Sequence, residues 1–508
     1  MRAIAASACL LSLMGCMEVP IADADDRPAS YALADPGVTH LGRLLSRHAP
    51  DAVGSGFAVL SSGRDALLAL HGLASVSQKT LDVQYYIWRK DDTGRALLAT
   101  LLQAADRGVR VRMLLDDWEP SWTDDELATL DAHPNFEVRL YNPSVSRSNR
   151  FLSVLLDFPR ITHRMHNKAF IADNVAAIVG GRNIGDRYFS VSGDANFRDL
   201  GLFAAGQITR GVSESFDAYW NSPWSLRLQD IGYRDRTPGA LGAMARQLEQ
   251  PLHTAGDIPL RQSAFMAPHD RVEARFSRLI WAESAVVAVD PPDKPATSRA
   301  TVLRELQDEL VDNVDRELLI EVAYLVPRSF GVEALCHLAR RGIRLHVLTN
   351  SLESSDAVTT YAGYQDSRKQ LLRCGIDLYE MRGDGGMVER DRSALGANYS
   401  AHLHSKAAVG DNRHVFVGSF NADPRSVNLN TEIALLIDSP ALAEEVSGFI
   451  RDGMSPLNAY RVSLEGEALV WHSAERGHPV ASREEPGRTF WRGLYSDLLS
   501  ILPIEGQL

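Results

Sequence analysis

RMHNKAFIADNVAAIVGGRN at residues 164–183 has a near copy later in the chain, LHSKAAVGDNRHVFVGSFN at residues 403–421. Each copy contains a His, a Lys two places on, an Asp five places further, a pair of small residues and an Asn. The apolar residues after each Lys predict a buried strand, and side chains two apart on a strand share a face. The His and Lys of each copy are therefore expected on one face. The residues are His166, Lys168, Asp173 and Asn183 in the first copy, and His404, Lys406, Asp411 and Asn421 in the second.

The sequence around the two motifs is duplicated as well. RGVRVRMLLDD and RGIRLHVLTNS occupy equivalent places, with Gly108 and Gly342 separated by 234 residues. The two motif histidines are separated by 238 residues, so one insertion of a few residues reconciles the offsets and indicates a tandem duplication. Strands that alternate with helices imply a parallel or mixed sheet with covered faces. The expected strand, helix and strand are 80–88, 93–108 and 109–117 in the first half, and 317–327, 330–342 and 343–351 in the second.

Two imidazoles and two ammonium groups suit a phosphodiester, provided that the halves pack so that these groups meet in one cleft. The lysines would neutralise charge that grows on the non-bridging oxygens. One His would attack phosphorus, while the other would protonate the departing oxygen and then deprotonate the incoming one. Asp173 and Asp411 complete the candidate catalytic motif. Because each follows its strand at a turn, hydrogen bonding within the turn or to a catalytic group suits it better than direct chemistry.

Each half also has an acid at the start of a later apolar strand. Asp199 in FRDLGL and Glu432 in NTEIALL are expected to orient a catalytic imidazole and favour one tautomer. Asp194 is a rival of Asp199, because it follows its His by 28 residues as Glu432 does, but the strand context favours Asp199. The small residues before Asn183 and Asn421 are expected to let backbone N–H groups approach a phosphate, and the two Asn amides to donate to its oxygens.

Other residues near the motifs have two interpretations. An acidic pair at the end of the 109–117 strand suggests a metal ligand, although such a pair more often caps a turn or helix. Zinc binding by the histidines is disfavoured, since their neighbours give no convincing ligand spacing. Four arginines before the first motif either bind lipid phosphates or belong to a solvated loop, and three tyrosines at strand ends either line the cleft or pack in the sheet core. These residues are Asp116, Asp117, Arg147, Arg150, Arg160, Arg164, Tyr85, Tyr86 and Tyr324.

The N-terminus is typical of a targeting segment. MRAIAASACLLSLMGCM combines Arg2 with a short apolar run and a small residue before Cys16. LMGC resembles the lipobox of bacterial lipoproteins, which implies cleavage before Cys16 and a lipid anchor on that residue. A plain secretory signal, an uncleaved anchor and a mistaken start codon are the alternatives. No other run reaches the roughly 18 apolar residues of a membrane-spanning helix, so the body is expected to be soluble or peripheral.

Cys336 and Cys374 are the two cysteines of the body of the chain. Their spacing gives no sign of a disulfide, so two independently buried thiols are expected. A disulfide between them is the alternative in an oxidising compartment.

The two complete HxKx4D motifs, each followed by GG or GS and an Asn, resemble the signature of the phospholipase D superfamily over about residues 60–470. This resemblance implies an α/β fold of tandem duplicated α/β/α sandwich domains related by pseudo-twofold symmetry. It also implies a phosphohistidine intermediate and no metal cofactor, with His166 as nucleophile and His404 as acid and base. TLDVQYYIW, GSFNADPRSVNLNTE and the closing SILPIE look like bacterial cardiolipin synthases, especially the cardiolipin synthase C type.

The narrower resemblance implies a phosphatidyltransferase that makes cardiolipin from phosphatidylglycerol, with phosphatidylethanolamine or a second phosphatidylglycerol as donor. A hydrolytic phospholipase D that releases phosphatidic acid is the alternative. A nucleic-acid phosphodiesterase is opposed by the net charge of −12 and the absence of a basic stripe. A lipid-binding protein without activity is opposed by two intact motifs. The expected location is the bacterial cell envelope, as a membrane-anchored lipoprotein facing the periplasm; the sequence leaves the oligomeric state open.

These observations divide the chain into six expected parts. The connector is rich in Pro, Gly and Ala and is expected to form one or two helices packed on the body. The tail has an apolar helical face that either packs on the core or lies on a membrane. The parts are a signal peptide at 1–16, a tether and first helix at 17–60, an N-terminal phospholipase D-like domain at 61–225, a connector insertion at 226–305, a C-terminal phospholipase D-like domain at 306–470 and an amphipathic tail at 471–508.

Overall fold

A computed structural model gives the structure of the chain. It describes residues 28–49, 54–144, 158–233, 239–248, 267–282, 284–384, 400–475 and 478–488. The expected signal peptide with Cys16, and the apolar helical face expected beyond residue 489, lie outside these ranges. No helix within them is both long enough and apolar enough to cross a membrane.

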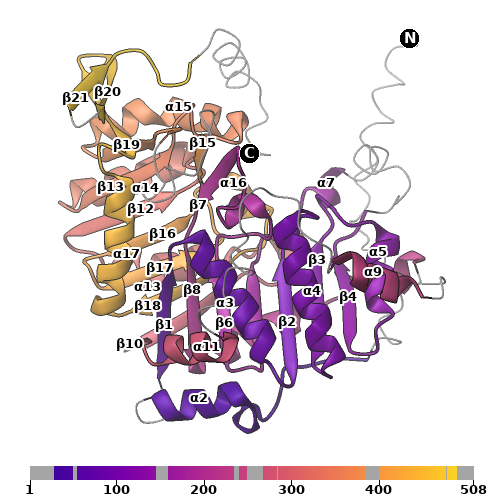
Figure 1. The fold of residues 1–508 in the computed structure, drawn as a ribbon. Helices are drawn as coiled ribbons and strands as arrows, with labels where there is room; N and C mark the ends of the chain where they lie inside the picture. Colours follow the sequence, from indigo (N-terminus) through magenta and orange to yellow (C-terminus); the bar gives the residue numbers. More distant parts are fainter. Residues whose placement is uncertain are drawn as a thin grey trace, which may run out of the picture.

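One large β-sheet is built mainly from the first half of the chain (Figure 1). Its strands lie in the order β10 (Ile280–Ala282), β1 (Ser55–Leu60), β8 (Gly201–Gly206), β6 (Ala176–Gly180), β5 (Ala169–Ala172), β2 (Thr80–Tyr85), β3 (Arg110–Asp116), β4 (Phe136–Tyr141) and β9 (Ser225–Arg227). The consecutive strands β2, β3 and β4 are parallel, as expected for strands joined by helices. β5 and β6 form an antiparallel hairpin beside β2.

A second sheet comes mainly from the second half. Its strands lie in the order β11 (Ser284–Val289), β18 (Ile433–Asp438), β17 (His414–Gly418), β16 (Lys406–Gly410), β12 (Glu317–Val322), β13 (Arg344–Asn350), β14 (Asp377–Met381), β19 (Ala459–Glu465), β20 (Ala468–Glu475) and β21 (His478–Ser482). The run β18-β17-β16-β12-β13-β14 has the same order as β8-β6-β5-β2-β3-β4. The duplication is therefore confirmed at the level of the fold.

Helices cover both faces of each sheet. The helices that form the main layers are α3 (Gly63–Val76), α4 (Asp92–Asp106), α8 (Gln207–Trp220), α14 (Arg328–Arg340), α15 (Val358–Arg373) and α17 (Pro440–Gly453). The shorter helices are η2 (Pro36–Val38), α2 (His40–His48), α5 (Asp124–Asp131), α7 (Phe158–Ile161), η3 (Asp186–Tyr188), η4 (Leu228–Ile231), α9 (Ala240–Leu248), α11 (Pro268–Phe276), α12 (Lys294–Thr297), α13 (Thr301–Glu309), η5 (Val311–Asn313) and α16 (Pro424–Asn428).

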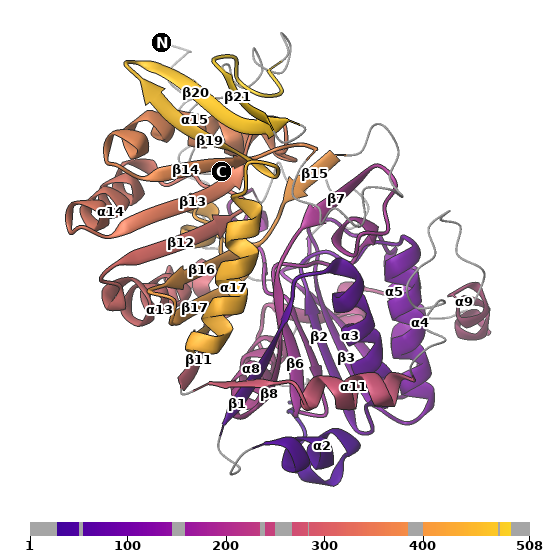
Figure 2. The same ribbon diagram turned by 60° about the vertical axis from the view of Figure 1, so that its left-hand side comes forward.

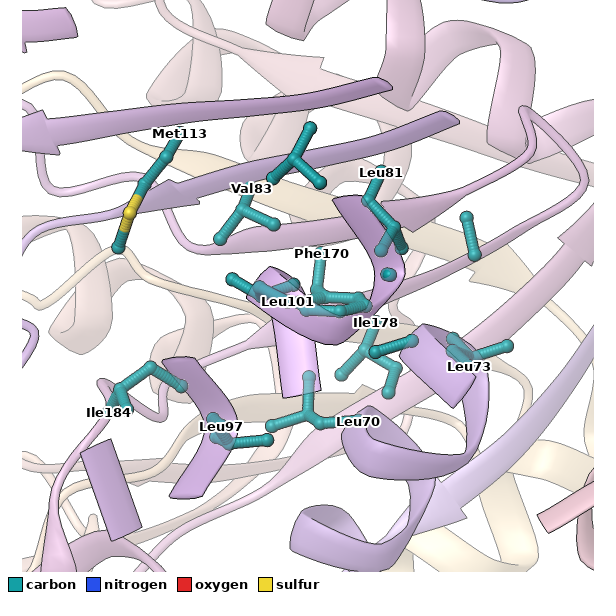
Figure 3. Packing of buried hydrophobic residues seen from close by; sticks show 14 of the residues in the cluster. Leu70, Leu73, Leu81, Val83, Leu97, Leu101, Met113, Phe170, Ile178 and Ile184 are labelled. Atoms are coloured by element: carbon teal, nitrogen blue, oxygen red, sulfur yellow. The ribbon is translucent and has the colours of Figure 1, made fainter. Parts of the chain in front are cut away.

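The apolar faces of these helices produce three cores. The first core joins α3 and α4 to one face of the first sheet, where Leu70 and Leu97 pack near Phe170 (Figure 3). The second lies between the two sheets and contains Phe216 of α8 and Val446 of α17, so it belongs to both halves. The third joins α14 and α15 to the far face of the second sheet. Burial of side chains from both halves in the middle core holds the two sheets together.

The strand, helix and strand predicted in each half are confirmed, with strands that end a few residues earlier than predicted. The expectation of one or two helices in the connector is too low, since its described residues contain η4, α9, α11, α12 and the start of α13. The connector also contains β10 and β11, which its Pro-, Gly- and Ala-rich sequence does not predict. These two short strands extend the edges of the first and second sheets respectively, pairing with β1 and β18.

Cys336 of α14 and Cys374, directly after α15, form a disulfide with Cα atoms 5.3 Å apart. The expectation of two independent thiols is wrong. The two helices pack side by side on the same face of the second sheet, and this tertiary proximity leaves no mark in the spacing of the cysteines.

Candidate active site

A short parallel sheet of two strands links the halves next to Asp199 and His404. β15 (Ser400–Leu403) pairs in parallel with β7 (Ala195–Arg198), and the two strands lie side by side between the halves (Figure 2). The backbone N–H of His404 then donates to the carbonyl of Arg198, at 2.8 Å. Since His404 follows β15 and Asp199 follows β7, this pairing brings the two side chains to the same place.

The other histidine is positioned by a smaller version of the same arrangement. Met165 forms an isolated parallel bridge with Thr431, and the backbone N–H of His166 donates to the Thr431 carbonyl at 2.9 Å. Glu432 follows Thr431 directly in the chain. In both places a backbone contact between the halves delivers a histidine from one half to an acid from the other.

The two imidazole–carboxylate pairs are both buried. His166 Nδ1 lies 2.8 Å from Glu432 Oε2, and His404 Nδ1 lies 2.7 Å from Asp199 Oδ2. A carboxylate on Nδ1 favours the tautomer with the proton on that nitrogen, which leaves Nε2 of each ring unprotonated. The structure thus places Asp199 on a histidine, whereas the rival Asp194 is exposed.

Different neighbours hold the two acids in place. Glu432 accepts from the hydroxyls of Ser426, at 2.8 Å, and Ser419. Asp199 accepts from the backbone N–H of Leu200 at 2.7 Å, and a Cβ built on Gly181 would lie 2.3 Å from its Oδ1. Only glycine, which has no Cβ, leaves room for this carboxylate at position 181.

The expectation that these small residues turn their backbone N–H groups toward a phosphate is wrong for Gly181 and Ser419. The N–H of Gly181 donates to the carbonyl of Leu200 at 3.1 Å, and that of Ser419 to the carbonyl of Ile433 at 2.9 Å. Both N–H groups therefore bind carbonyls of the neighbouring chain segment and do not face a phosphate. The spacing of the motif does not reveal which carbonyls these are.

Both histidines line one cavity of about 780 Å³. Tyr86 and Tyr324 are in its wall, while Tyr85 is buried in the first core, which settles the two interpretations of these tyrosines. The rings of Tyr86 and His166 are in edge contact, with centroids 5.1 Å apart. A cavity of this volume is large enough for a phosphodiester headgroup.

The motif lysines lie just behind the histidines. Lys168 Nζ donates to the carbonyl of His166 at 2.6 Å, and Lys406 Nζ donates to the carbonyl of His404. Burial lowers the pKa of Lys168 well below its ordinary value, opposed by the nearby Glu432 and reinforced by Lys406. Burial also lowers the pKa of Lys406. The two ammonium groups are close enough to repel one another, and an anion in the cavity would relieve that repulsion.

Both imidazoles are held in the neutral form. Burial lowers the pKa of His166 to about 4, although Glu432 opposes the shift. Burial and Lys406 lower the pKa of His404, against the opposing effect of Asp199. At neutral pH each Nε2 therefore carries a lone pair, which a nucleophile or general base requires.

The two motif asparagines differ in what their amides contact. Asn183 accepts from the backbone N–H of Ile87 at 3.2 Å and donates to the hydroxyl of Tyr188 at 3.0 Å, so its amide is committed within the protein. Asn421 also lines the cavity, and among the described residues its buried Oδ1 has no hydrogen-bond partner. This oxygen is an acceptor, so it is available to a hydroxyl or N–H group of a ligand.

The structure does not bring Asp173 and Asp411 to the histidines. Asp173 accepts from the backbone N–H groups of Lys79 and Thr80, at 2.7 and 2.9 Å, at the start of β2. Asp411 accepts from those of Asp315, Arg316 and Glu317 at the start of β12, at 2.8 to 2.9 Å. Each carboxylate therefore lies at the end of its hairpin opposite to the cavity.

Asp116 helps to position the first motif, a role that its place in the sequence does not reveal. Its Oδ2 accepts from the backbone N–H of Met165 at 2.8 Å, immediately before His166. In the second half Asn350 Oδ1 accepts from Leu403, immediately before His404, at 2.9 Å. The aligned sequences of the two strands show that Asp116 and Asn350 are equivalent. They do not show that each side chain binds the backbone N–H next to a motif histidine.

The arginines before the first motif have internal partners where they are described. Arg160 donates to the carbonyl of Pro143 at 3.2 Å, and Arg164 to Asp116 Oδ1 at 3.2 Å, with both guanidinium groups buried. The lipid-phosphate and solvated-loop interpretations are therefore both wrong for these two. Arg147 and Arg150 lie outside the described residues. Within the described ranges no cluster of three or more His, Cys, Asp or Glu side chains could hold a metal ion.

Comparisons with known proteins agree with this geometry. A family model described as "Cardiolipin synthase, PLD-like domain" matches residues 72–220 and 309–452. Cardiolipin synthase C of Escherichia coli (strain K12) is 36% identical over 457 residues, covering 88% of this chain and 94% of that protein. An uncharacterized protein of Helicobacter pylori (strain ATCC 700392 / 26695) is 32% identical over 480 residues, covering 94% of each chain. Phosphatidylserine synthase of Haemophilus influenzae Rd KW20 is similar in fold, with a TM-score of 0.51 at 14% identity over 82% of this chain and 91% of that one.

Proposed function

Because the chain belongs to the family of phospholipase D-like cardiolipin synthases, we propose that it is a phosphatidyltransferase that makes cardiolipin through a phosphohistidine intermediate. The acceptor is phosphatidylglycerol, and the donor is phosphatidylethanolamine or a second phosphatidylglycerol. The observation that carries the proposal is the pair of buried imidazoles in one cavity, each held at Nδ1 by a carboxylate from the other half.

In the first step the Nε2 lone pair of His166 attacks the phosphorus of the donor. The bond from phosphorus to the headgroup oxygen breaks, and its electron pair stays on that oxygen, which takes a proton from Nε2 of His404. The anionic donor favours the protonated form of His404 in the complex, because a nearby negative charge raises the pKa of an imidazole. The products are the phosphatidyl-histidine and the free headgroup alcohol.

In the second step a hydroxyl of the phosphatidylglycerol headgroup gives its proton to Nε2 of His404. Its oxygen forms a bond to phosphorus, the phosphorus–nitrogen bond breaks, and the electron pair returns to His166. Asp199 and Glu432 keep the two rings oriented through both steps and stabilise the imidazolium forms. The assignment of nucleophile and acid follows the family resemblance, since each ring has an equivalent carboxylate.

Lys168 and Lys406 stabilise the negative charge that builds on the non-bridging oxygens in the transition states. In the free enzyme the two buried ammonium groups repel each other, so binding of an anion in the cavity is favourable. The unpaired Oδ1 of Asn421 is an acceptor, so it supports a contact with a hydroxyl of a lipid headgroup and not with the phosphate oxygens. No step in this scheme requires a metal ion.

The proposal is tested by lipid mass spectrometry of a cardiolipin-null bacterial strain that expresses the chain. Cardiolipin is expected, and a rise in phosphatidic acid alone would identify a hydrolytic phospholipase D. With purified protein and a donor lipid labelled with ³²P, His404→Ala is expected to form the phosphoenzyme from a donor with a nitrophenol leaving group, whereas His166→Ala forms none. The reverse result would exchange the two roles, and EDTA is expected to leave the wild-type rate unchanged.

We further propose that the protein works in the bacterial envelope, anchored through Cys16 and facing the periplasm. The disulfide between Cys336 and Cys374 supports an oxidising compartment, where such bonds persist. Cys16→Ser is expected to release the protein from the membrane fraction, and radiolabelled palmitate should label the wild type and not this variant. Labelling of both would contradict the anchor.

A further inference from the structure

We infer that the end of the cavity beside His404 binds the phosphate of the acceptor lipid, and that Arg187 is the residue that recognises it. This inference rests on the proposed function, because it concerns the lipid that intercepts the phosphohistidine. Binding of the acceptor phosphate by Arg187 would favour transfer to an anionic lipid over transfer to water or to an uncharged alcohol.

Arg187 lies in η3, which forms part of the cavity wall on the side of His404. The next residue, Tyr188, has its ring in edge contact with the ring of His404, at 5.2 Å between centroids. The Arg187 side chain is exposed, and among the described residues it makes no hydrogen bond or ion pair. An unpaired guanidinium at the edge of an anion-binding cavity is free to pair with a ligand.

The other two arginines in the wall already have partners. Arg89 forms an ion pair with Glu119 at 2.5 Å, and Arg425 donates to the carbonyl of Thr162 at 3.0 Å. Arg425 lies four residues after Asn421, as Arg187 does after Asn183, so the duplication placed an arginine at each end of the cavity. The one beside His404 has kept its guanidinium free.

All five acidic residues in the wall have partners within the protein. The exposed Asp356 accepts from the hydroxyl of Tyr324 at 3.0 Å, and Glu119 forms the ion pair with Arg89. The other three accept from backbone N–H groups. Asp91 accepts from the backbone N–H groups of Gly94 and Asp186, at 3.0 and 2.8 Å. The carboxylate of Asp186 accepts from the backbone N–H of Thr93 at 2.8 Å. Asp423 accepts from the N–H of Ser426 in the same manner, at 2.7 Å. Each caps a turn or helix, which commits its charge to the backbone.

The chemistry of the acceptor explains why a cation is needed at this place. The hydroxyl that attacks phosphorus must reach Nε2 of His404, and the acceptor's own phosphate is one glycerol unit away from that hydroxyl. A guanidinium can bind two phosphate oxygens at once. Binding energy from this remote contact orients the hydroxyl for attack and gives the lipid an advantage over water, which has no group to place there.

The test compares two acceptors that share the reacting hydroxyl and differ in the phosphate. Purified enzyme is given a ³²P-labelled donor lipid with a nitrophenol headgroup, in vesicles with either unlabelled phosphatidylglycerol or free glycerol as acceptor. Labelled cardiolipin is counted in the first case and labelled phosphatidylglycerol in the second. Arg187→Gln is expected to lower transfer to phosphatidylglycerol relative to transfer to glycerol by about tenfold to a hundredfold, the usual effect of a lost charge-assisted hydrogen bond. Arg187→Lys should lose less, because it keeps the charge.

Arg210→Gln, an exposed arginine on α8 away from this cavity, is the matched control and should leave the ratio unchanged. An unchanged ratio in Arg187→Gln, or an equal loss with both acceptors, would overturn the inference while wild-type cardiolipin formation still upheld the proposed function. Failure of the wild type to form any phosphoenzyme would instead remove the proposed function, and the inference with it.

Discussion

Asp199 Oδ2 accepts a hydrogen bond from Nδ1 of His404 at 2.7 Å, across the boundary between the two halves of the chain. Glu432 makes the reciprocal contact with His166 at 2.8 Å. Neither half therefore supplies the acid that contacts its own motif histidine. A single half would lack the acid that fixes the tautomer of its histidine. Activity is therefore expected to require both halves of the chain.

The first prediction concerns Asp199. Asp199→Asn is expected to lower kcat by about 10²–10⁴-fold, because an amide cannot hold His404 in the same tautomer or stabilise its imidazolium. The measurement is steady-state cardiolipin formation, with circular dichroism to establish that the variant is folded. Asp194→Asn is the control and should keep wild-type activity, since Asp194 is exposed. A larger loss of kcat in Asp194→Asn than in Asp199→Asn would show that Asp194, and not Asp199, orients the histidine.

The sequence predicted the members of this site better than their pairing. The repeated spacing identified His166 and His404, and strand context selected Asp199. Which acid contacts which histidine depends on the pairing of β7 with β15 and of Met165 with Thr431. These are backbone contacts between segments more than 200 residues apart, and no local pattern encodes them.

The second prediction follows from the lowered pKa of His166. With a nitrophenol-based donor, whose leaving group needs no proton, the rate of phosphoenzyme formation should stay constant from neutral pH to about pH 5. It should then fall as the pH approaches about 4, where His166 takes a proton. Rapid-quench measurement of ³²P-phosphoenzyme across this range tests it. A midpoint near 6.5, the ordinary value of a histidine, would show that burial does not depress this pKa.

The same shift makes stability depend on pH. Between about pH 6.5 and 4 the unfolded chain binds a proton on this histidine that the folded protein does not, so the free energy of unfolding falls as the pH is lowered. The full effect is about 3 kcal/mol, from about 1.36 kcal/mol per pH unit, and it is complete below pH 4. In His166→Gln the pH dependence of denaturant unfolding should be weaker by this amount over the same window.

The third prediction separates the motif aspartates from the chemistry. Burial tends to raise the pKa of Asp411, but three backbone N–H donors outweigh it and lower the pKa. Asp411→Asn is expected to destabilise the second half by about 1–3 kcal/mol through weaker bonds to these amides. An Asn tolerates the left-handed backbone at this position, where φ is 50°, so the substitution adds no strain.

Phosphoenzyme formation per folded molecule should remain within about twofold of wild type in Asp411→Asn, the small change expected for a residue outside the site. Asp173→Asn provides the counterpart in the first half and should lose more stability, since Asp173 is fully buried. If turnover fell by more than the amount of folded protein, Asp173 and Asp411 would have a direct role in catalysis.

Parts of the fold escaped the sequence analysis for a related reason. β10 and β11 are short edge strands in a Pro- and Gly-rich region, and an edge strand is specified mainly by the strand that it joins. Small residues near a catalytic motif predict an approach of the backbone to phosphate at Gly181, and this prediction is wrong. The neighbour of Gly181 is Asp199, which lies in the turn before the adjacent strand β8, and the spacing along the chain does not reveal this contact.

The last prediction concerns the disulfide that links α14 to the end of α15. Cys336→Ser is expected to lower the free energy of unfolding of the second half by about 2–4 kcal/mol, because the bond closes a long loop and restricts the unfolded chain. Dithiothreitol should destabilise the wild type by a similar amount and leave Cys336→Ser unaffected, as measured by the midpoint of denaturant unfolding. Turnover at low temperature should be retained in both, since these cysteines lie on the outer helices and not in the cavity wall. Equal stability of wild type and variant under oxidising conditions would mean that the two thiols do not form this bond.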